Sequence, residues 1–191
     1  MKSFLAILSI WTFIVIVTPI AMQGVKINDS QSSLDNIRLE IVSKGKSMVK
    51  YRTENGNDFS ITSENGKVVF MENDWLQDEK GCKPLYSSFK FGQTTLKEIR
   101  RKFGTNGFSH QNMGTFKTDT HVIMFNCFEF DSPNNEVLVT ITKVSLDDEV
   151  TEKNVAEKAK LDALIIADKG YLEREWGEEK LFDPNYHKIK P

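Results

Sequence analysis

Alternation of apolar and polar residues dominates the first half of the chain. Apolar residues alternate with polar ones over 37–43, the period-two pattern of a half-buried strand. Asn-Gly dipeptides at 55–56 and 65–66 favour two-residue hairpin turns, because both turn positions need a positive φ. We therefore predict an antiparallel meander of four strands, at 37–43, 47–53, 58–64 and 67–72.

The segment 90–104, KFGQTTLKEIRRKFG, has the pattern of a short amphipathic helix. Thr95 and Glu98 have the spacing of a capping box, and Gly104 can end the helix in a left-handed conformation. One face carries the apolar residues Leu96, Ile99 and Phe103. A helix this short needs a platform, so we predict that 95–103 packs through Phe103 on the strands that follow.

The rest of the chain alternates between strand and helix signals. A loop carrying Trp75 is predicted at 73–84, and two strands with apolar residues on both faces are predicted at 121–130 and 136–144. The segment 147–167 is interpreted as a helix to about Ala159 followed by a strand, with one continuous helix as the alternative. A helix is predicted at 170–179. No internal repeat is evident in the sequence, and the predicted fold class is α+β: an antiparallel sheet with a few short helices packed on it.

The N-terminus has the layout of a secretory signal. Lys2 precedes a nearly continuous apolar run, which predicts a signal peptide at 1–23 or, as an alternative, an uncleaved membrane anchor formed by 4–20. The polar segment 24–35 is interpreted as a linker, and 36–191 as a single domain. We therefore expect a periplasmic or secreted protein that contacts a membrane only if the anchor is retained.

Charge and cysteine content refine this picture. The chain has a formal net charge of −2 at pH 7, which disfavours nucleic acid as a partner because a phosphate-binding surface is strongly basic. Cys82 and Cys127 are the only cysteines. In an exported protein they are expected to form a disulfide, and two separately buried thiols are the alternative.

Residues capable of catalysis or metal binding do not form a recognisable motif. His110, His121 and His187 lack the short spacings of metal ligands, so no metal site is predicted. No nucleophile elbow and no glycine-rich phosphate or dinucleotide loop occurs, so we predict no catalytic residues and no cofactor. The carboxylates at 147–149 and 173–179 are interpreted as solvated helix ends.

Aromatic residues form the remaining candidate site. Tryptophan and tyrosine dominate the hot spots of protein interfaces, although packing beneath long loops is the alternative explanation. The residues of this possible partner-binding set are Trp75, Tyr171, Trp176, Phe182 and Tyr186.

A partial family resemblance lies in residues 90–144. The segment resembles the start of the SmpA/OmlA-type small β-barrel-assembly lipoproteins and the related β-lactamase-inhibitor-like domains, with a short helix followed by antiparallel strands. The matching residues are Gly92, Thr94, Ile99, Phe103 and Gly104. The helix has one residue more than the usual pattern, and the lipid-bearing cysteine is missing. The resemblance implies exported, non-catalytic scaffolding.

The leading hypothesis is an exported envelope protein that binds another protein, as an assembly factor, inhibitor or immunity-type partner, without catalysis. A first alternative is an envelope hydrolase that uses carboxylates such as Glu175, or His110. A second alternative is a carrier of small ligands, with its pocket between the helix at 95–103 and the sheet.

Overall fold

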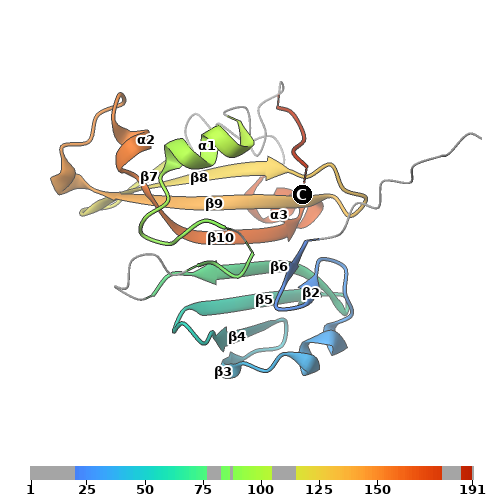
Figure 1. Ribbon diagram of the computed structural model, residues 1–191. Coiled ribbons are helices and arrows are strands. Elements are labelled where there is room, and N and C mark those ends of the chain that lie inside the picture. Colours follow the sequence, from blue (N-terminus) through green and yellow to red (C-terminus); the bar gives the residue numbers. More distant parts are fainter. Residues whose placement is uncertain (1–19, 77–82, 87, 105–114, 178–185, 191) are drawn as a thin grey trace, which may run out of the picture.

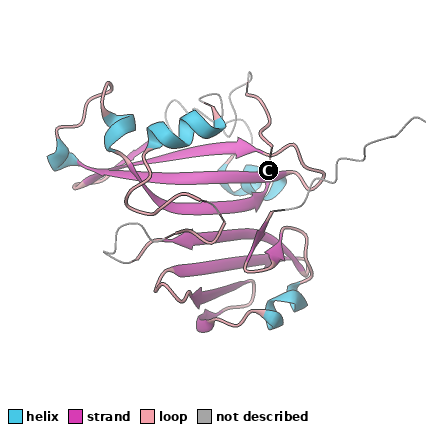
Figure 2. Cartoon of the chain, in the orientation of Figure 1, coloured by secondary structure: helices cyan, strands magenta, loops and turns pink. Residues whose placement is uncertain are grey.

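The computed structural model describes residues 20–76, 83–86, 88–104, 115–177 and 186–190. An eight-stranded antiparallel sheet forms the centre of the fold, with strand order β3-β4-β5-β6-β10-β9-β8-β7 (Figure 1). Short helices lie against this sheet, which confirms the predicted α+β class (Figure 2). No helix in the described ranges combines the length and the apolar character needed to cross a membrane.

The first half of the fold comprises a small hairpin, a short 3-10 helix and four strands. They are β1 (Ala21–Met22), β2 (Val25–Lys26), η1 (Gln31–Asn36), β3 (Glu40–Lys44), β4 (Met48–Arg52), β5 (Asp58–Glu64) and β6 (Lys67–Asp74). The second half comprises four strands and four short helices. They are α1 (Leu96–Phe103), β7 (Thr115–Lys117), β8 (His121–Glu129), β9 (Glu136–Ser145), η2 (Leu146–Asp148), α2 (Val155–Lys158), β10 (Lys160–Asp168) and α3 (Lys169–Trp176).

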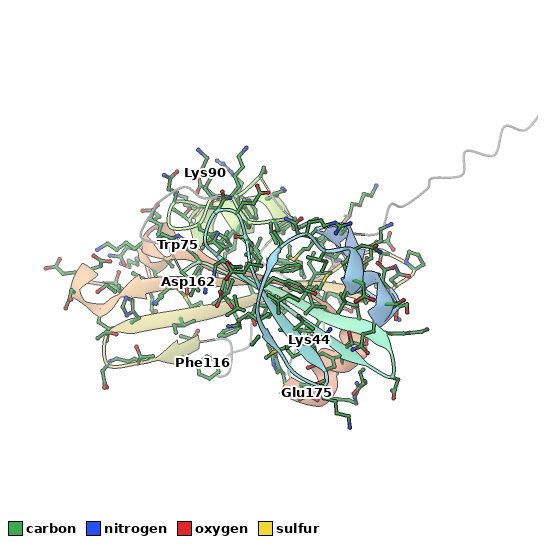
Figure 3. The ribbon with its side chains drawn as sticks, turned by 90° about the horizontal axis from the view of Figure 1, so that it is seen from below. Lys44, Trp75, Lys90, Phe116, Asp162 and Glu175 are labelled. Carbon is green, nitrogen blue, oxygen red and sulfur yellow. The ribbon has the colours of Figure 1, made fainter. Side chains whose placement is uncertain are left out.

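The sheet has two faces that carry separate clusters of buried side chains. The first face carries the larger cluster, to which the η1 residue Leu34 and the α1 residue Ile99 belong. The second face carries a cluster that α3 covers with Leu172. Figure 3 shows this division, because Lys90, just before α1, and Glu175, in α3, lie on opposite sides of the sheet.

The two halves repeat one structural unit, a helix followed by a four-stranded meander. In the first half, Ser30 caps η1 and forms a bridge with Lys67 at the start of β6. In the second half, Thr95 caps α1 and forms the same bridge with Lys160 at the start of β10. The expectation that the chain contains no repeat is therefore corrected, because the repetition lies in hydrogen-bond register rather than in residue identity.

A pseudo-twofold axis relates the two halves. At the junction of β6 and β10, Glu72 faces Ile165, and the pairs Phe70–Ala167 and Asp74–Ala163 lie symmetrically on either side. Positions in the two meanders can thus be compared directly by their strand register.

The interpretation of 24–35 as a linker is wrong. Val25, Ile27 and Leu34 are buried in the cluster of the first face, and the Asn28 amide donates to the Val68 carbonyl at 2.8 Å. These apolar side chains hold the polar segment on the sheet. They are spaced too widely in the sequence to form a strand or helix pattern. The domain therefore begins before residue 36, and cleavage after residue 23 would remove β1. The predicted signal at 1–23 otherwise lies mostly outside the described residues.

The first predicted strand differs in both extent and burial. β3 begins at Glu40 rather than at 37, and all five of its residues are exposed because it forms an edge of the sheet. The Asn65-Gly66 turn is confirmed, with φ values of 51° and 76°. In the Asn55-Gly56 turn only Gly56 has a positive φ, so this connection is not a two-residue turn of the predicted type.

Helix α1 has the predicted capping box and packs on the predicted strands. The Thr95 side chain accepts from the Glu98 amide, and the Thr95 amide donates to the Glu98 carboxylate at 2.7 Å. Leu96 and Ile99 are fully buried. Phe103 is only half-buried, although its ring lies 5.1 Å from that of Phe128. The deepest anchors are therefore Leu96 and Ile99 rather than Phe103.

Shortening Ile99 to valine should destabilise the protein by about 1 kcal/mol, because a methylene group is lost from a fully buried site. Arg101→Ala, at an exposed position of the same helix, should change stability by less than about 0.5 kcal/mol. Urea unfolding of both variants measures the difference. An effect of Arg101→Ala as large as that of Ile99→Val would contradict the assigned face.

In 147–167 the predicted strand is confirmed, the predicted helix to about Ala159 is present only in its last turn, and one continuous helix is excluded. α2 spans only Val155–Lys158, and β10 then pairs with both β6 and β9 at the centre of the sheet. The helix predicted at 170–179 is present as α3, which Asp168 caps through the Tyr171 amide at 2.8 Å.

A buried polar pair distinguishes the second half from the first. Asn126 and Thr140 face each other across β8 and β9, at the register positions of Val49 and Ile61. Both residues are buried, and Asn126 Nδ2 and Thr140 Oγ1 have no hydrogen-bond partner among the described residues. The double variant Asn126→Val/Thr140→Val should therefore raise the free energy of unfolding by about 1 kcal/mol. A loss of stability in urea unfolding would show that these groups are satisfied.

Candidate functional site

Charged side chains occupy the second face of the first half. They alternate along β4, β5 and β6 with the apolar residues that form the core of the first face. We call this set, together with the serine that lies between its members, the charged half-face. Its residues are Lys50, Arg52, Asp58, Ser60, Glu72 and Asp74.

Strand register arranges the charged half-face in two rows. One row runs Lys50–Ser60–Glu72 and continues across the axis into Ile165, Val139 and Cys127. The other runs Arg52–Asp58–Asp74 and continues into Ala163, Ile141 and Phe125. The positions equivalent to Lys50, Ser60 and Glu72 are Cys127, Val139 and Ile165, which belong to the cluster beneath α3. The position equivalent to Arg52 instead carries the buried Glu129.

Helix α3 also contacts the first half of the fold. It does so beyond these two rows, at the end of the sheet. The Tyr171 ring lies 5.8 Å from that of Phe70, and Arg174 pairs with Glu64 at 2.5 Å. This placement leaves Lys50 and Arg52 with side chains that are 32% and 34% exposed. The two basic residues of the charged half-face are thus partly exposed, whereas Cys127, at the position equivalent to Lys50, is packed beneath α3.

Asp58 holds the two basic residues of the charged half-face. Its carboxylate accepts from Lys50 Nζ at 3.0 Å and lies 3.1 Å from Arg52 Nη2. Arg52 also donates from Nη1 to the Gly56 carbonyl at 3.0 Å. Because the Asp58 side chain is only 9% exposed, these pairs fix both basic side chains in place.

Glu72 and Asp74 form a coupled carboxyl pair. Burial, the charge of Asp74 and a hydrogen bond between the two side chains together raise the pKa of Glu72 to about 7, against the opposing effect of Lys50. Burial also raises the pKa of Asp74, where Asp58 and Asp162 act in the same direction and Lys50 opposes them. The pair therefore holds a shared proton near neutral pH, because two carboxylates this close do not both ionise readily.

A second charged network fixes the C-terminal segment. Glu129, with a side chain only 2% exposed, accepts from Lys169 at 2.9 Å and pairs with Lys188 at 2.6 Å, and it also accepts from Tyr186. Burial opposes ionisation of Glu129, but hydrogen bonds from these three side chains outweigh it and lower its pKa. Ile189 extends the attachment by bridging to Phe130. This network is structural, because its charges are satisfied within the chain.

The predicted aromatic set does not form one surface. Trp75 packs against the first-face cluster, whereas Tyr171 and Trp176 pack on the second face. Tyr186 contacts Glu129 and Lys169, and Phe182 lies outside the described residues. The alternative explanation, packing against the core, fits the three described residues that lie on the sheet.

The residues named for the hydrolase alternative do not form a site in the described ranges. His110 lies outside them, and Glu175 is exposed on α3. Within those ranges, no group of three or more histidine, cysteine, aspartate or glutamate residues is placed to hold a metal ion.

Of the two cysteines, only Cys127 lies within the described residues. Cys127 is fully buried on the second face, where burial raises the pKa of its thiol, and it forms no disulfide with any described residue. Cys82 lies outside the described residues, although Leu85 and Tyr86 shortly after it pack on the first face. The bridge between the two cysteines stays a prediction.

Cys127 should not react with maleimide in the folded protein, because it is fully buried and burial disfavours the thiolate. Reaction in denaturant without reductant then distinguishes two outcomes. Two modified thiols by mass spectrometry would exclude the bridge, and none would support it. Rapid labelling of Cys127 in the folded protein would contradict its described burial.

The charged half-face was missed at the level of sequence, although a signal was present. Lys50 and Arg52 alternate with Val49 and Tyr51, so the strand pattern already assigns the basic pair to the face opposite the core. Comparison of the chain with protein families, with characterised proteins and with solved structures finds no match.

Proposed function

We propose that this is an exported protein that binds another protein through the charged half-face, without catalysis. One observation supports the proposal: α3 covers the row of Cys127, Val139 and Ile165 in the second half, whereas the equivalent row of the first half carries Lys50 and Glu72, and Asp58 fixes Lys50 in a partly exposed position. Fixed charges of both signs favour a specific, oriented partner over non-specific adsorption.

The partner expected at this surface presents basic groups. Asp58 neutralises much of the charge of Lys50 and Arg52, so the Glu72–Asp74 pair leaves acidic character at the centre of the sheet. A lysine or arginine side chain placed there would displace the shared proton and form a charge-assisted hydrogen bond.

Site-specific photo-cross-linking in the native host tests the interface. A photoreactive residue placed at Lys50 should yield one defined cross-linked protein, identified by mass spectrometry, and the same residue at the exposed Lys153 should not. Glu72→Lys should abolish the product without unfolding the protein, because it places a positive charge opposite a basic partner. Equal products from both positions, or no product at Lys50, would refute the proposed interface.

Export is tested separately. A fusion of residues 1–30 to a reporter that is active only outside the cytoplasm should give activity. A fusion that is stably expressed but gives no reporter activity would contradict export. It would not affect the proposed binding surface.

A second candidate, the hydrolase, is favoured by the carboxyl pair alone. A carboxyl group whose pKa is raised towards neutrality can serve as a general acid. Hydrolytic activity of the purified protein that disappears in Glu72→Gln and Asp74→Asn, but persists in the exposed control Glu40→Gln, would favour this candidate over protein binding.

A further inference from the structure

The segment 20–27 is part of the folded domain. Ile20 is 4% exposed, Met22 is fully buried, and both lie in the first-face cluster together with Val25 and Ile27. β1 and β2 form a hairpin in which Met22 faces Val25. Loss of the start of this segment would therefore take side chains out of the core and leave β2 unpaired.

A buried carboxyl group also holds the start of this segment. Glu136, the first residue of β9, is fully buried. Burial raises its pKa, and hydrogen bonds from Ser132 and Asn134 oppose this effect. The backbone amide of Ile20 lies within hydrogen-bonding reach of the same carboxyl group and opposes it as well, as does the charge of Lys26. The backbone of Ile20 is thus bound to the second half of the fold, while its side chain packs in the core.

The sequence at this boundary lacks the pattern of a cleaved signal. A processed leader has small residues at its last position and two places before it. Three bonds near the end of the apolar run follow a small residue, those after Thr18, Ala21 and Gly24. The residue two places earlier is isoleucine, proline and methionine respectively, so the small pair is missing at all three bonds. Cleavage after Ala21 or Gly24 would in addition remove Ile20 from the core.

The residues before Ile20 are suited to remain in a membrane. No charged residue occurs between Lys2 and Lys26. As a helix, the uncharged stretch 3–19 would span roughly 25 Å, at the lower end of the range for a transmembrane segment. Lys2 precedes this stretch, and positive charge favours the cytoplasmic side, so the domain is expected on the opposite side of the membrane.

We propose that the stretch 3–19 is retained as a membrane anchor, with the chain packed in the exported domain from Ile20 onward. This inference rests on the proposed export and names its end point, a membrane rather than a soluble compartment. It does not depend on the charged half-face. Because Ile20 is already buried, the domain follows the anchor directly and lies at the membrane surface.

Retention fixes which end of the sheet lies nearest to the membrane. Glu136 pairs with Asp168 at one end of the central strands, and Ile20 lies beside this end. From Glu136 to Ile141, β9 covers roughly 17 Å, and Ile141 shares its row with Asp74. This row of the charged half-face therefore lies away from the bilayer, where a partner outside the membrane can reach it.

Fractionation of cells of the native host tests the proposal. After washing with alkaline carbonate the protein should stay with the membranes, and its intact mass should include residues 3–19. A protease added outside the sealed membrane should digest the domain. Soluble protein that begins at Pro19 or later, recovered outside the cytoplasm, would overturn retention but leave export intact. A domain protected from the protease would contradict export, and the anchor with it.

Two variants at one position test the missing cleavage site. Pro19→Ala gives the bond after Ala21 the small pair that the wild type lacks, so most of this variant should be released as soluble protein that begins at Met22. Pro19→Val, which creates no such pair, should stay in the membrane like the wild type. A wild type released as fully as Pro19→Ala would overturn the proposal.

Melting of the purified full chain in detergent tests whether the hairpin is needed. Met22→Gln, which places an amide in the core, should lower the melting temperature by about 5 °C or more. Gln23→Asn, at the exposed neighbouring position with a φ of 51°, should leave it unchanged. Equal melting temperatures would show that the domain tolerates loss of this hairpin and would overturn the structural argument for retention.

Discussion

Replacing Gly92 by alanine should destabilise the protein by about 3 kcal/mol, the sum of left-handed backbone strain and overpacking. Gly92 has a φ of 65°, and its amide donates to the Leu161 carbonyl at 2.8 Å. A Cβ at this position would lie 2.9 Å from Trp75 Cζ3, 3.0 Å from Cζ2 and closer still to Cη2. The indole is packed against the first-face cluster and cannot easily retreat.

A second glycine serves as the matched control. Gly66 has a similar φ of 76°, but a Cβ there would meet nothing within 4 Å. Gly66→Ala should therefore cost only about 1 kcal/mol of backbone strain, and the difference between the two variants isolates the contact with Trp75. Urea unfolding gives both values, and equal costs would show that Trp75 does not occupy the described position.

The double variant Gly92→Ala/Trp75→Leu extends this test. Because the smaller side chain removes the overlap, its free-energy cost should be lower than the sum of the two single costs by about 1 kcal/mol or more. Additive costs would indicate that backbone strain alone explains the effect of Gly92→Ala.

Replacing Glu72 by glutamine should stabilise the protein at pH 8 by about 2 kcal/mol and have little effect at pH 4. The pKa of Glu72 rises from an ordinary 4.5 to about 7 on folding. The neutral carboxyl therefore contributes its full stability below pH 4.5, and this contribution is lost as the pH rises towards 7. Glutamine remains neutral throughout, so its advantage over the wild type should grow across the same interval.

This stabilisation is smaller than the full change in pKa implies, because Glu72 is only half-buried and solvent screens its charge. Urea unfolding between pH 4 and pH 8 provides the measurement, and Glu40→Gln, at an exposed position, is expected to parallel the wild type. Asp74→Asn should move the wild-type transition to lower pH, because Asp74 raises the pKa of Glu72. A Glu72→Gln advantage that does not change with pH would refute the coupled pair.

The sequence by itself determined those features that depend on neighbouring residues. The capping box of Thr95 and Glu98 and the Asn65-Gly66 turn follow from local hydrogen bonding. The strands around Phe59 and Phe128 follow from short runs of apolar residues between turns. These interactions span at most a few residues, so their residue types are visible side by side in the chain.

Tertiary structure decided the features that depend on strand register. The halves repeat although their residues differ, since Asn126 and Thr140 stand where Val49 and Ile61 stand in the first half. The burial of 24–35 likewise depends on isolated anchors such as Leu34 meeting a distant strand. The repeat was missed because backbone hydrogen bonds, rather than a recurring set of side chains, define it. The burial of 24–35 was missed because its apolar residues are too isolated to form a pattern.

The candidate sites depend on the same long-range pairing. The half-face charges alternate visibly along β4 to β6, but the raised pKa of Glu72 depends mainly on its burial in the folded sheet, to which Asp74 adds and which Lys50 opposes. Sequence patterns assign a residue to a face of a strand, whereas its charge state and the space beside it depend on neighbours that are distant in the chain.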